Sequence, residues 1–172
     1  MAPKLTKLRA VLADLDIYLA NEHELLAITA VNAVKPALAR LRPFYAGHIV
    51  IKLGPRGALW VPAGTTAPIH TAARSVKAIN TVGAGDTFNG ALLAALDCGR
   101  AFPAALFFAH AAAASVVSSP LGVLGLSTPR CQQESLGCRK SPTTRRLPAA
   151  DARARGQRVC RSAVIPRNPG HL

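Results

Sequence analysis

Residues 80–90 hold the residue types in this chain that are best placed to do chemistry: Gly83, Ala84 and Gly85, followed at once by a carboxylate. A long apolar segment follows, and it is expected to form a helix whose first turn contains these small residues. N–H groups in the first turn of a helix lack intrahelical acceptors and lie at the positive end of its dipole. The stretch therefore predicts an anion hole at residues 83–85.

Asp86 directly follows the predicted anion hole, where its charge would repel a bound anion. A carboxylate at this place makes chemical sense if it takes a proton from an alcohol that attacks a phosphoryl group. The simpler interpretation of Gly-Ala-Gly-Asp, taken alone, is a tight strand-to-helix turn, because short motifs recur by chance. The residues on either side of the motif are needed to choose between a catalytic site and a simple turn.

The longer run over residues 81–92, TVGAGDTFNGAL, closely resembles the signature of the ribokinase-like carbohydrate kinases, also called the phosphofructokinase-B-type family. Residues 108–114, FAHAAAA, continue the resemblance, and here the chain is most similar to the ribokinase branch. The resemblance implies transfer of the ATP γ-phosphoryl group to a sugar hydroxyl, with ribose as the first candidate. It also implies Asp86 as general base, ATP as cosubstrate and Mg²⁺ as cofactor.

The segment Asn21-Glu22-His23-Glu24 predicts a helix N-terminus, with Asn21 as the N-cap and acidic residues in the first turn. The same segment is also similar to the Asn-x-x-Glu element of this kinase family. The resemblance implies that Glu24 holds Mg²⁺ through water and that Asn21 lies near the phosphates. Because Mg²⁺ prefers oxygen ligands and retains waters, one carboxylate is chemically sufficient.

The segment Gly54-Pro55-Arg56-Gly57 predicts a turn between two strands. It resembles the family loop that covers the nucleotide, which implies nucleotide contacts from Gly54, Arg56 and Gly57. Lys52 stands where the family has Thr, so a hydroxyl is replaced by a charge that can reach the phosphates. His110 matches a family position beside the adenine, although a satisfied or surface histidine is the simpler interpretation.

Asn80 stands where the family signature begins with Asp, a residue that generally belongs to a monovalent-cation site. The amide keeps an oxygen ligand and loses the charge. The family's Arg-x-Gly-Ala-like turn after the alanine-rich helix is also replaced, by residues 118–122, SSPLG. Both departures argue against activation by K⁺.

The net charge of +13 is unevenly distributed: residues 130–172 hold 10 of the 21 Lys and Arg and 2 of the 8 Asp and Glu. A high pI would otherwise indicate a nucleic-acid binder. Here, a nucleic-acid or membrane-surface binder that acts through this Arg-rich segment is only the last-ranked alternative function, because a solvated tail is the commoner meaning of such a composition. Residues 129–172 are rich in Arg, Pro, Ser and Gly without apolar periodicity, which predicts a low-complexity, disordered tail.

The chain is 50% hydrophobic but only 5% aromatic, which suits an α/β fold with a core of Ala, Leu and Val. We expect residues 1–128 to form the C-terminal, nucleotide-binding and catalytic part of a ribokinase-like domain, with a mostly parallel sheet flanked by helices. Helices are expected over residues 5–13 and 22–28, at Lys35-Pro36 with Pro36 in the first helical position, from the glycine turn onward and over 103–117. Strands are expected over 16–20, 48–53 and 58–61, and two more within 62–79, one of them at 75–79.

The family's sugar-binding elements, an early Asp, a Gly-Gly-Asn-type turn and a small β-sheet lid, have no counterpart in this sequence. The alternative function is therefore a truncated, non-catalytic nucleotide-binding remnant. No Walker-type Gly-x-x-x-x-Gly-Lys-Ser/Thr occurs, so a P-loop enzyme is not a competitor. No membrane partner is expected. A homodimer stays open, and four cysteines without metal spacing favour the reducing cytoplasm.

Overall fold

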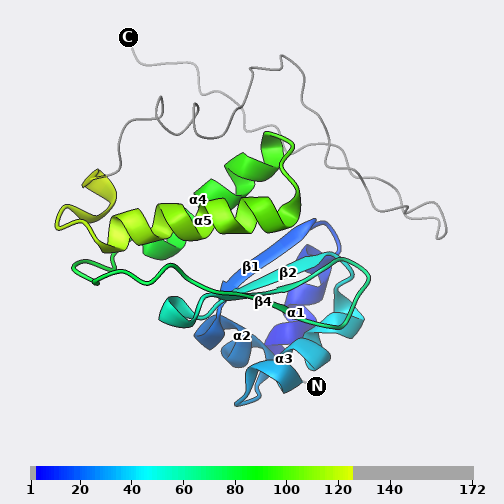
Figure 1. The fold of residues 1–172 in the computed structure, drawn as a ribbon. Helices are drawn as coiled ribbons and strands as arrows, with labels where there is room; N and C mark the ends of the chain where they lie inside the picture. Colours follow the sequence, from blue (N-terminus) through cyan, green and yellow to red (C-terminus); the bar gives the residue numbers. More distant parts are fainter. Residues whose placement is uncertain (1–2, 126–172) are drawn as a thin grey trace, which may run out of the picture.

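The computed structural model describes residues 3–125 and contains a sheet between two layers of helices (Figure 1). The predicted tail, residues 129–172, lies outside the described residues. The four strands follow each other across the sheet in chain order. β1 pairs with β2 in parallel, whereas β2–β3 and β3–β4 are antiparallel, so β3 alone among these strands runs against the others. The strands are β1 (Ile17–Asn21), β2 (His48–Lys52), β3 (Ala58–Val61) and β4 (Ile69–Thr71).

Helices cover both faces of this sheet, as Figure 1 shows, so the predicted α/β fold is confirmed. One layer holds α1 (Pro3–Leu12), α2 (Glu22–Thr29) and α3 (Val34–Leu41), and the other holds α4 (Ala84–Asp97) and α5 (Phe102–Val117). Short 3₁₀ turns η1 (Arg42–Phe44), η2 (Gly54–Arg56) and η3 (Gly122–Gly125) complete the described elements.

The central strand β2 is buried on both faces, which explains its continuous apolar sequence. Ile49 and Ile51 belong to the core beneath α1, α2 and α3, whereas Val50 belongs to the core beneath α4 and α5. All three side chains are fully buried. Because successive side chains of a strand point to opposite faces, this five-residue strand contributes apolar side chains to both cores.

Two of the sequence-based expectations for local structure are wrong. Residues 75–79 form no strand: they are exposed, and the backbone N–H groups of Ile79 and Asn80 bond only to the carbonyl of Val117 at the end of α5. The β-leaning composition there has no neighbouring strand to pair with. The helix expected to begin with Pro36 begins two residues earlier, at Val34. Pro36 still falls in the first turn, where no N–H is needed.

An aromatic stack joins the sheet to the start of α5. The Phe102 ring stacks on both Trp60 and His48, with ring centroids 4.6 Å and 4.5 Å away. The Nδ1 atom of His48 accepts hydrogen bonds from the Trp60 indole N–H at 3.1 Å and from the Ala63 amide at 3.2 Å. Protonation of Nδ1 would break both bonds. Burial, followed by the charge of Arg42, lowers the pKa of His48 below its ordinary value of 6.5.

The folded protein should lose stability as the pH falls below about 6.5, the ordinary histidine pKa. Burial also lowers the pKa of His110, with His70 adding to the effect. Since both folded-state pKa values are depressed, the unfolded chain takes up protons first. The stabilisation is complete above the unfolded pKa and is lost as the pH falls toward the folded values. Denaturant titrations followed by fluorescence of Trp60, the single tryptophan, measure the effect.

A double variant, His48→Asn with His110→Gln, serves as the control, because each new side chain keeps a polar atom near its place and does not titrate. Its free energy of unfolding should change less between pH 7.5 and pH 5.5 than that of the parent chain. Equal pH dependence in the two proteins would contradict the assignment.

Candidate functional site

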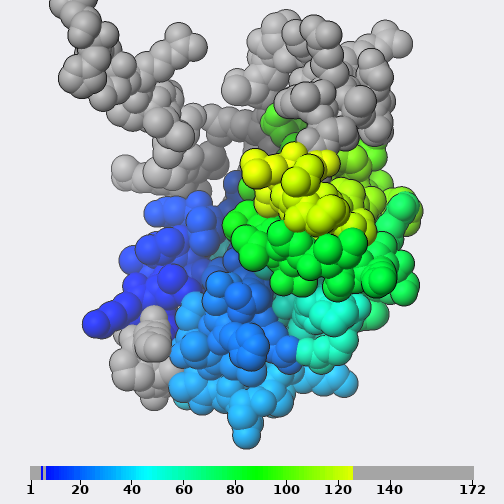
Figure 2. All heavy atoms as spheres, turned by 90° about the vertical axis from the view of Figure 1, so that its left-hand side faces the viewer, coloured from blue at the N-terminus to red at the C-terminus, as the bar shows by residue number. Residues whose placement is uncertain are grey.

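The turn before α4 brings its first N–H groups to the surface. Gly83 is the N-cap residue and has φ of 79°, a backbone conformation that favours glycine. A Cβ at this position would also lie 2.1 Å from Cγ2 of Val123, so η3 packs directly against the glycine. In the space-filling view, the yellow residues of η3 lie on the green part of the chain, above the blue and cyan N-terminal half (Figure 2).

The predicted anion hole is open in part. Within residues 3–125, the N–H groups of Gly83, Gly85 and Asp86 have no hydrogen-bond acceptor, and Gly85 and Asp86 are exposed. The N–H of Ala84 bonds to the carbonyl of Thr81 at 3.3 Å, a long contact that closes the turn. Three neighbouring donors of the first turn, on residues 83, 85 and 86, thus remain available to an anion.

Asp86 lies in the first turn of α4, with its side chain exposed. No hydrogen bond or ion pair to another residue within 3–125 occupies its carboxylate. A solvent-facing carboxylate beside free amides is free to accept a proton from a substrate hydroxyl.

The parallel pairing of β1 with β2 brings the second group of predicted residues to the same edge of the sheet. Asn21 and Lys52 are the last residues of their strands, and they are register partners. The Nζ of Lys52 lies 3.4 Å from the place where a Cβ of Gly85 would be, and it donates to Oδ1 of Asn89 at 3.0 Å. The carboxyl ends of parallel strands are where ligands bind in α/β sheets.

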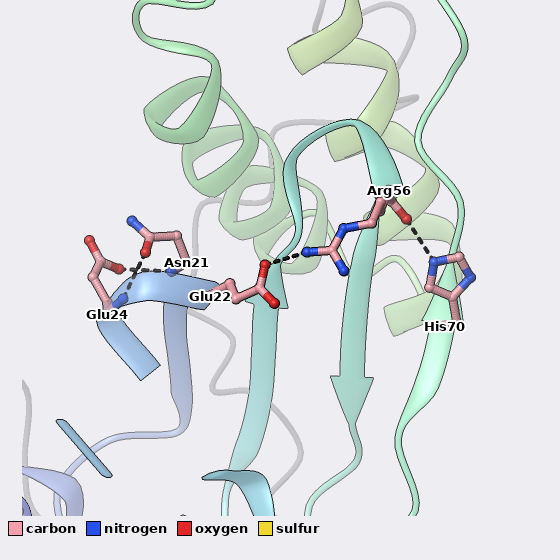
Figure 3. Close-up of polar contacts among 5 residues, drawn as sticks. All are labelled: Asn21, Glu22, Glu24, Arg56 and His70. Atoms are coloured by element: carbon pink, nitrogen blue, oxygen red, sulfur yellow. Dashed lines mark hydrogen bonds and ion pairs between the residues drawn. The ribbon is translucent and has the colours of Figure 1, made fainter. Parts of the chain in front are cut away.

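Asn21 caps α2 as predicted, and a reciprocal capping box fixes its neighbour Glu24 (Figure 3). Oδ1 of Asn21 accepts from the Glu24 N–H, and Oε2 of Glu24 accepts from the Asn21 N–H, both at 2.8 Å. The second carboxylate oxygen of Glu24 has no protein partner within the described part of the chain. No group of three His, Cys, Asp or Glu side chains is gathered within residues 3–125. The free carboxylate oxygen of Glu24 is a donor of the kind that suits Mg²⁺, an ion that retains several of its waters.

The loop between β2 and β3 is attached to α2 by an ion pair between Arg56 and Glu22, which Figure 3 shows. The Arg56 carbonyl also accepts from Nε2 of His70 at 2.7 Å. The sequence-based interpretation gave Arg56 a nucleotide contact and missed Glu22 as its partner. A spacing of 34 residues offers no local signal for such a pair.

The remaining predicted residues have structural partners. His110 is only 7% exposed, its Nε2 lies 3.0 Å from the Thr71 hydroxyl, and its ring packs edge-on against Phe88. These contacts explain its burial without a nucleotide. Oδ1 of Asn80 accepts from the Val82 N–H at 3.0 Å, so the amide already has a role in the turn before α4.

The fold is shared with sugar kinases. The ribokinase of Thermotoga maritima has a TM-score of 0.62 at 30% identity, over 71% of this chain and 42% of its own. The ribokinase of Arabidopsis thaliana, complexed with ribose and ATP, has a TM-score of 0.65 at 26% identity, over 74% and 43%. The fructokinase of Vibrio cholerae O395, with fructose, ADP and calcium, has a TM-score of 0.63 at 26% identity, over 77% and 44%.

The chain belongs to the pfkB family of carbohydrate kinases, whose family model matches residues 1–129. The resemblance identified from residues 81–92 is therefore confirmed. The chain spans less than half the length of each of the three kinases above. None of the helices between residues 3 and 125 is long and apolar enough to cross a membrane.

Gly57→Ala should destabilise the fold strongly. Gly57 has φ of 93°, and a Cβ there would lie 2.0 Å from the carbonyl oxygen of Thr71 on β4. Backbone strain and the clash together should cost about 3 kcal/mol or more of unfolding free energy. Gly54→Ala is the matched control: its φ is 61° and no atom lies within 4 Å. Its cost should be about 1 kcal/mol. Equal costs in thermal or urea unfolding would contradict this account of Gly57.

Proposed function

We propose that the chain carries out ATP-dependent phosphorylation of a sugar hydroxyl, with ribose as the first candidate substrate. The observation that carries the proposal is the exposed carboxylate of Asp86 beside amides of the same helix turn that lack acceptors within residues 3–125. Membership of the pfkB family supports sugar phosphorylation in general. Ribose rests on the similarity to ribokinases, and the fructokinase match makes fructose the first alternative sugar.

In this proposal, Asp86 accepts the proton of the sugar hydroxyl while the hydroxyl oxygen of the sugar attacks the γ-phosphorus of ATP. The bond between that phosphorus and the bridging oxygen breaks, and ADP leaves with the electron pair. Gly83, Ala84 and Gly85 hold the transferred group, with the N–H of Ala84 exchanging its long bond to Thr81 for the anion. Lys52 adds a positive charge beside Gly85.

Mg²⁺, when bound, would neutralise phosphate charge, and the residues present fit it. Glu24 would hold the ion through water with its free oxygen, and the capping box keeps that carboxylate in place. Asn21 lies beside Lys52 at the end of the parallel pair and would face the phosphates. Gly54, Arg56 and Gly57 would border the nucleotide, with Arg56 keeping its ion pair to Glu22. His110 would lie beside the adenine while keeping its contacts with Thr71 and Phe88. Asn80 keeps its role in the turn before α4, and no K⁺ is invoked.

A second candidate function is nucleotide binding without phosphoryl transfer. It is favoured by one observation: the chain covers only 42–44% of the length of each of the three kinases described above. Correct positioning of the acceptor hydroxyl lowers the activation barrier of such reactions by on the order of 7 kcal/mol or more. Calorimetry with ATP and Mg²⁺, run beside a phosphoryl-transfer assay with ribose and fructose, separates the two functions. Binding without sugar phosphate formation would support the second.

Asp86→Asn should abolish sugar phosphorylation without weakening the binding of MgATP. The amide keeps the shape of the side chain but does not take up the proton, and loss of a general base typically costs about 10² to 10⁴ in rate. Coupled detection of ADP measures turnover, and calorimetry measures affinity.

Asp97→Asn is the matched control, because Asp97 is exposed at the far end of the same helix. It should leave both quantities unchanged. Turnover by Asp86→Asn equal to that of the parent chain would remove Asp86 from the mechanism.

A further inference from the structure

Lys52 and Asn89 form a contact that neither the motif nor the family signature required. Lys52 ends β2, Asn89 lies in the second turn of α4, and 37 residues separate them. The ammonium donates one hydrogen bond to Oδ1 of Asn89 at 3.0 Å. Asn89 follows Gly85 by four residues, so both lie on the same face of the helix. The contact therefore fixes the ammonium above the first turn of α4.

Gly85 lies directly beside the ammonium, at a distance where a Cβ would make ordinary van der Waals contact with it. The Nζ of Lys52 lies 3.4 Å from the Cβ position that any other residue would fill there. A larger side chain at residue 85 would compete with the lysine for this place. Lys52, Gly85 and Asn89 thus form one set of contacts that joins the end of β2 to the first two turns of α4.

The charge of Lys52 is not neutralised by the protein around it. The only ion pair within residues 3–125 joins Arg56 to Glu22, so no carboxylate in that range lies within 4 Å of the half-buried ammonium. A carboxylate would be the stronger partner for a purely structural lysine. Asn89 instead offers a neutral oxygen, which orients the ammonium and leaves its full charge for an anion.

We propose that Asn89 is a positioning residue, which holds Lys52 so that its ammonium binds the terminal phosphoryl oxygens of a nucleoside triphosphate. The inference rests on the proposed function, since it assigns Lys52 to the phosphate held by the N–H groups of Gly83 and Gly85. A lysine side chain has many rotamers, and fixing it before the ligand arrives lowers the entropy lost on binding. Asn89 itself touches Lys52 and not the nucleotide.

The test is calorimetry of the full chain with MgATP, MgADP and AMP, using Lys52→Met, Asn89→Ala and the double variant. Lys52→Met should weaken MgATP binding by about ten-fold or more, and Asn89→Ala by about three- to ten-fold. Both losses should shrink from MgATP to MgADP and vanish for AMP. Because Asn89 acts through Lys52, the double variant should bind MgATP no more weakly than Lys52→Met.

Asn89→Asp separates a positioning role from a structural one. The new carboxylate would pair with Lys52, so the thermal midpoint should stay the same or rise while MgATP binding weakens. Asn32→Asp makes the same charge change at an exposed residue between α2 and α3 and should leave both quantities unchanged. A structural role predicts instead that affinity follows the thermal midpoint in every variant.

Two results would overturn the inference while leaving the proposed function in place: MgATP affinity in Asn89→Ala equal to that of the parent chain, or additive losses in the double variant. A parent chain that binds no MgATP would overturn the proposed function itself, and the inference with it. The parent measurement therefore tells the two failures apart.

Discussion

The parallel pairing of β1 with β2 is the constraint on which the candidate site depends. It sets Asn21 and Lys52 side by side at the carboxyl ends of their strands, and the capping box then fixes Glu24 beside them. A shift of one residue in this register would turn each side chain to the opposite face of the sheet. The burial of β2 in two cores prevents that shift, because Ile49 and Ile51 pack in one core and Val50 packs in the other.

The second requirement is the place of α4 against the same edge of the sheet. Phe88 and Leu92 are buried in the core shared with Val50, and this packing brings the first turn of the helix near Lys52. Burial of such side chains contributes roughly 1.5–3 kcal/mol each, and this core contains many of them, whereas Lys52 and Asn89 share a single hydrogen bond of about the same size as one of these terms. The apolar core therefore positions the polar groups, and the open N–H groups of Gly83 and Gly85 are a consequence of where the helix begins.

Local signals in the sequence predicted much of this arrangement. The apolar run at β2, the N-cap at Asn21 and the glycine turn before α4 each act over a few residues, and each is found as expected. Contacts between distant residues could not be predicted in this way: Arg56 with Glu22, Lys52 with Asn89 and His110 with Thr71 are all set by the packing of separate elements. The missing strand at residues 75–79 has the same origin, because strand propensity needs a neighbouring strand to become structure.

The most direct test of the account is nuclear magnetic resonance of the ¹⁵N-labelled chain during titration with MgADP and then with MgATP. We expect the largest amide shifts at residues 83–86, because the N–H groups of Gly83, Gly85 and Asp86 lack acceptors among residues 3–125 and that of Ala84 exchanges its bond to Thr81 for the anion. These shifts should grow when the γ-phosphate is present. Shifts that leave these four amides unchanged while others respond, or no shifts at all, would contradict the claim that the first turn of α4 holds the phosphate.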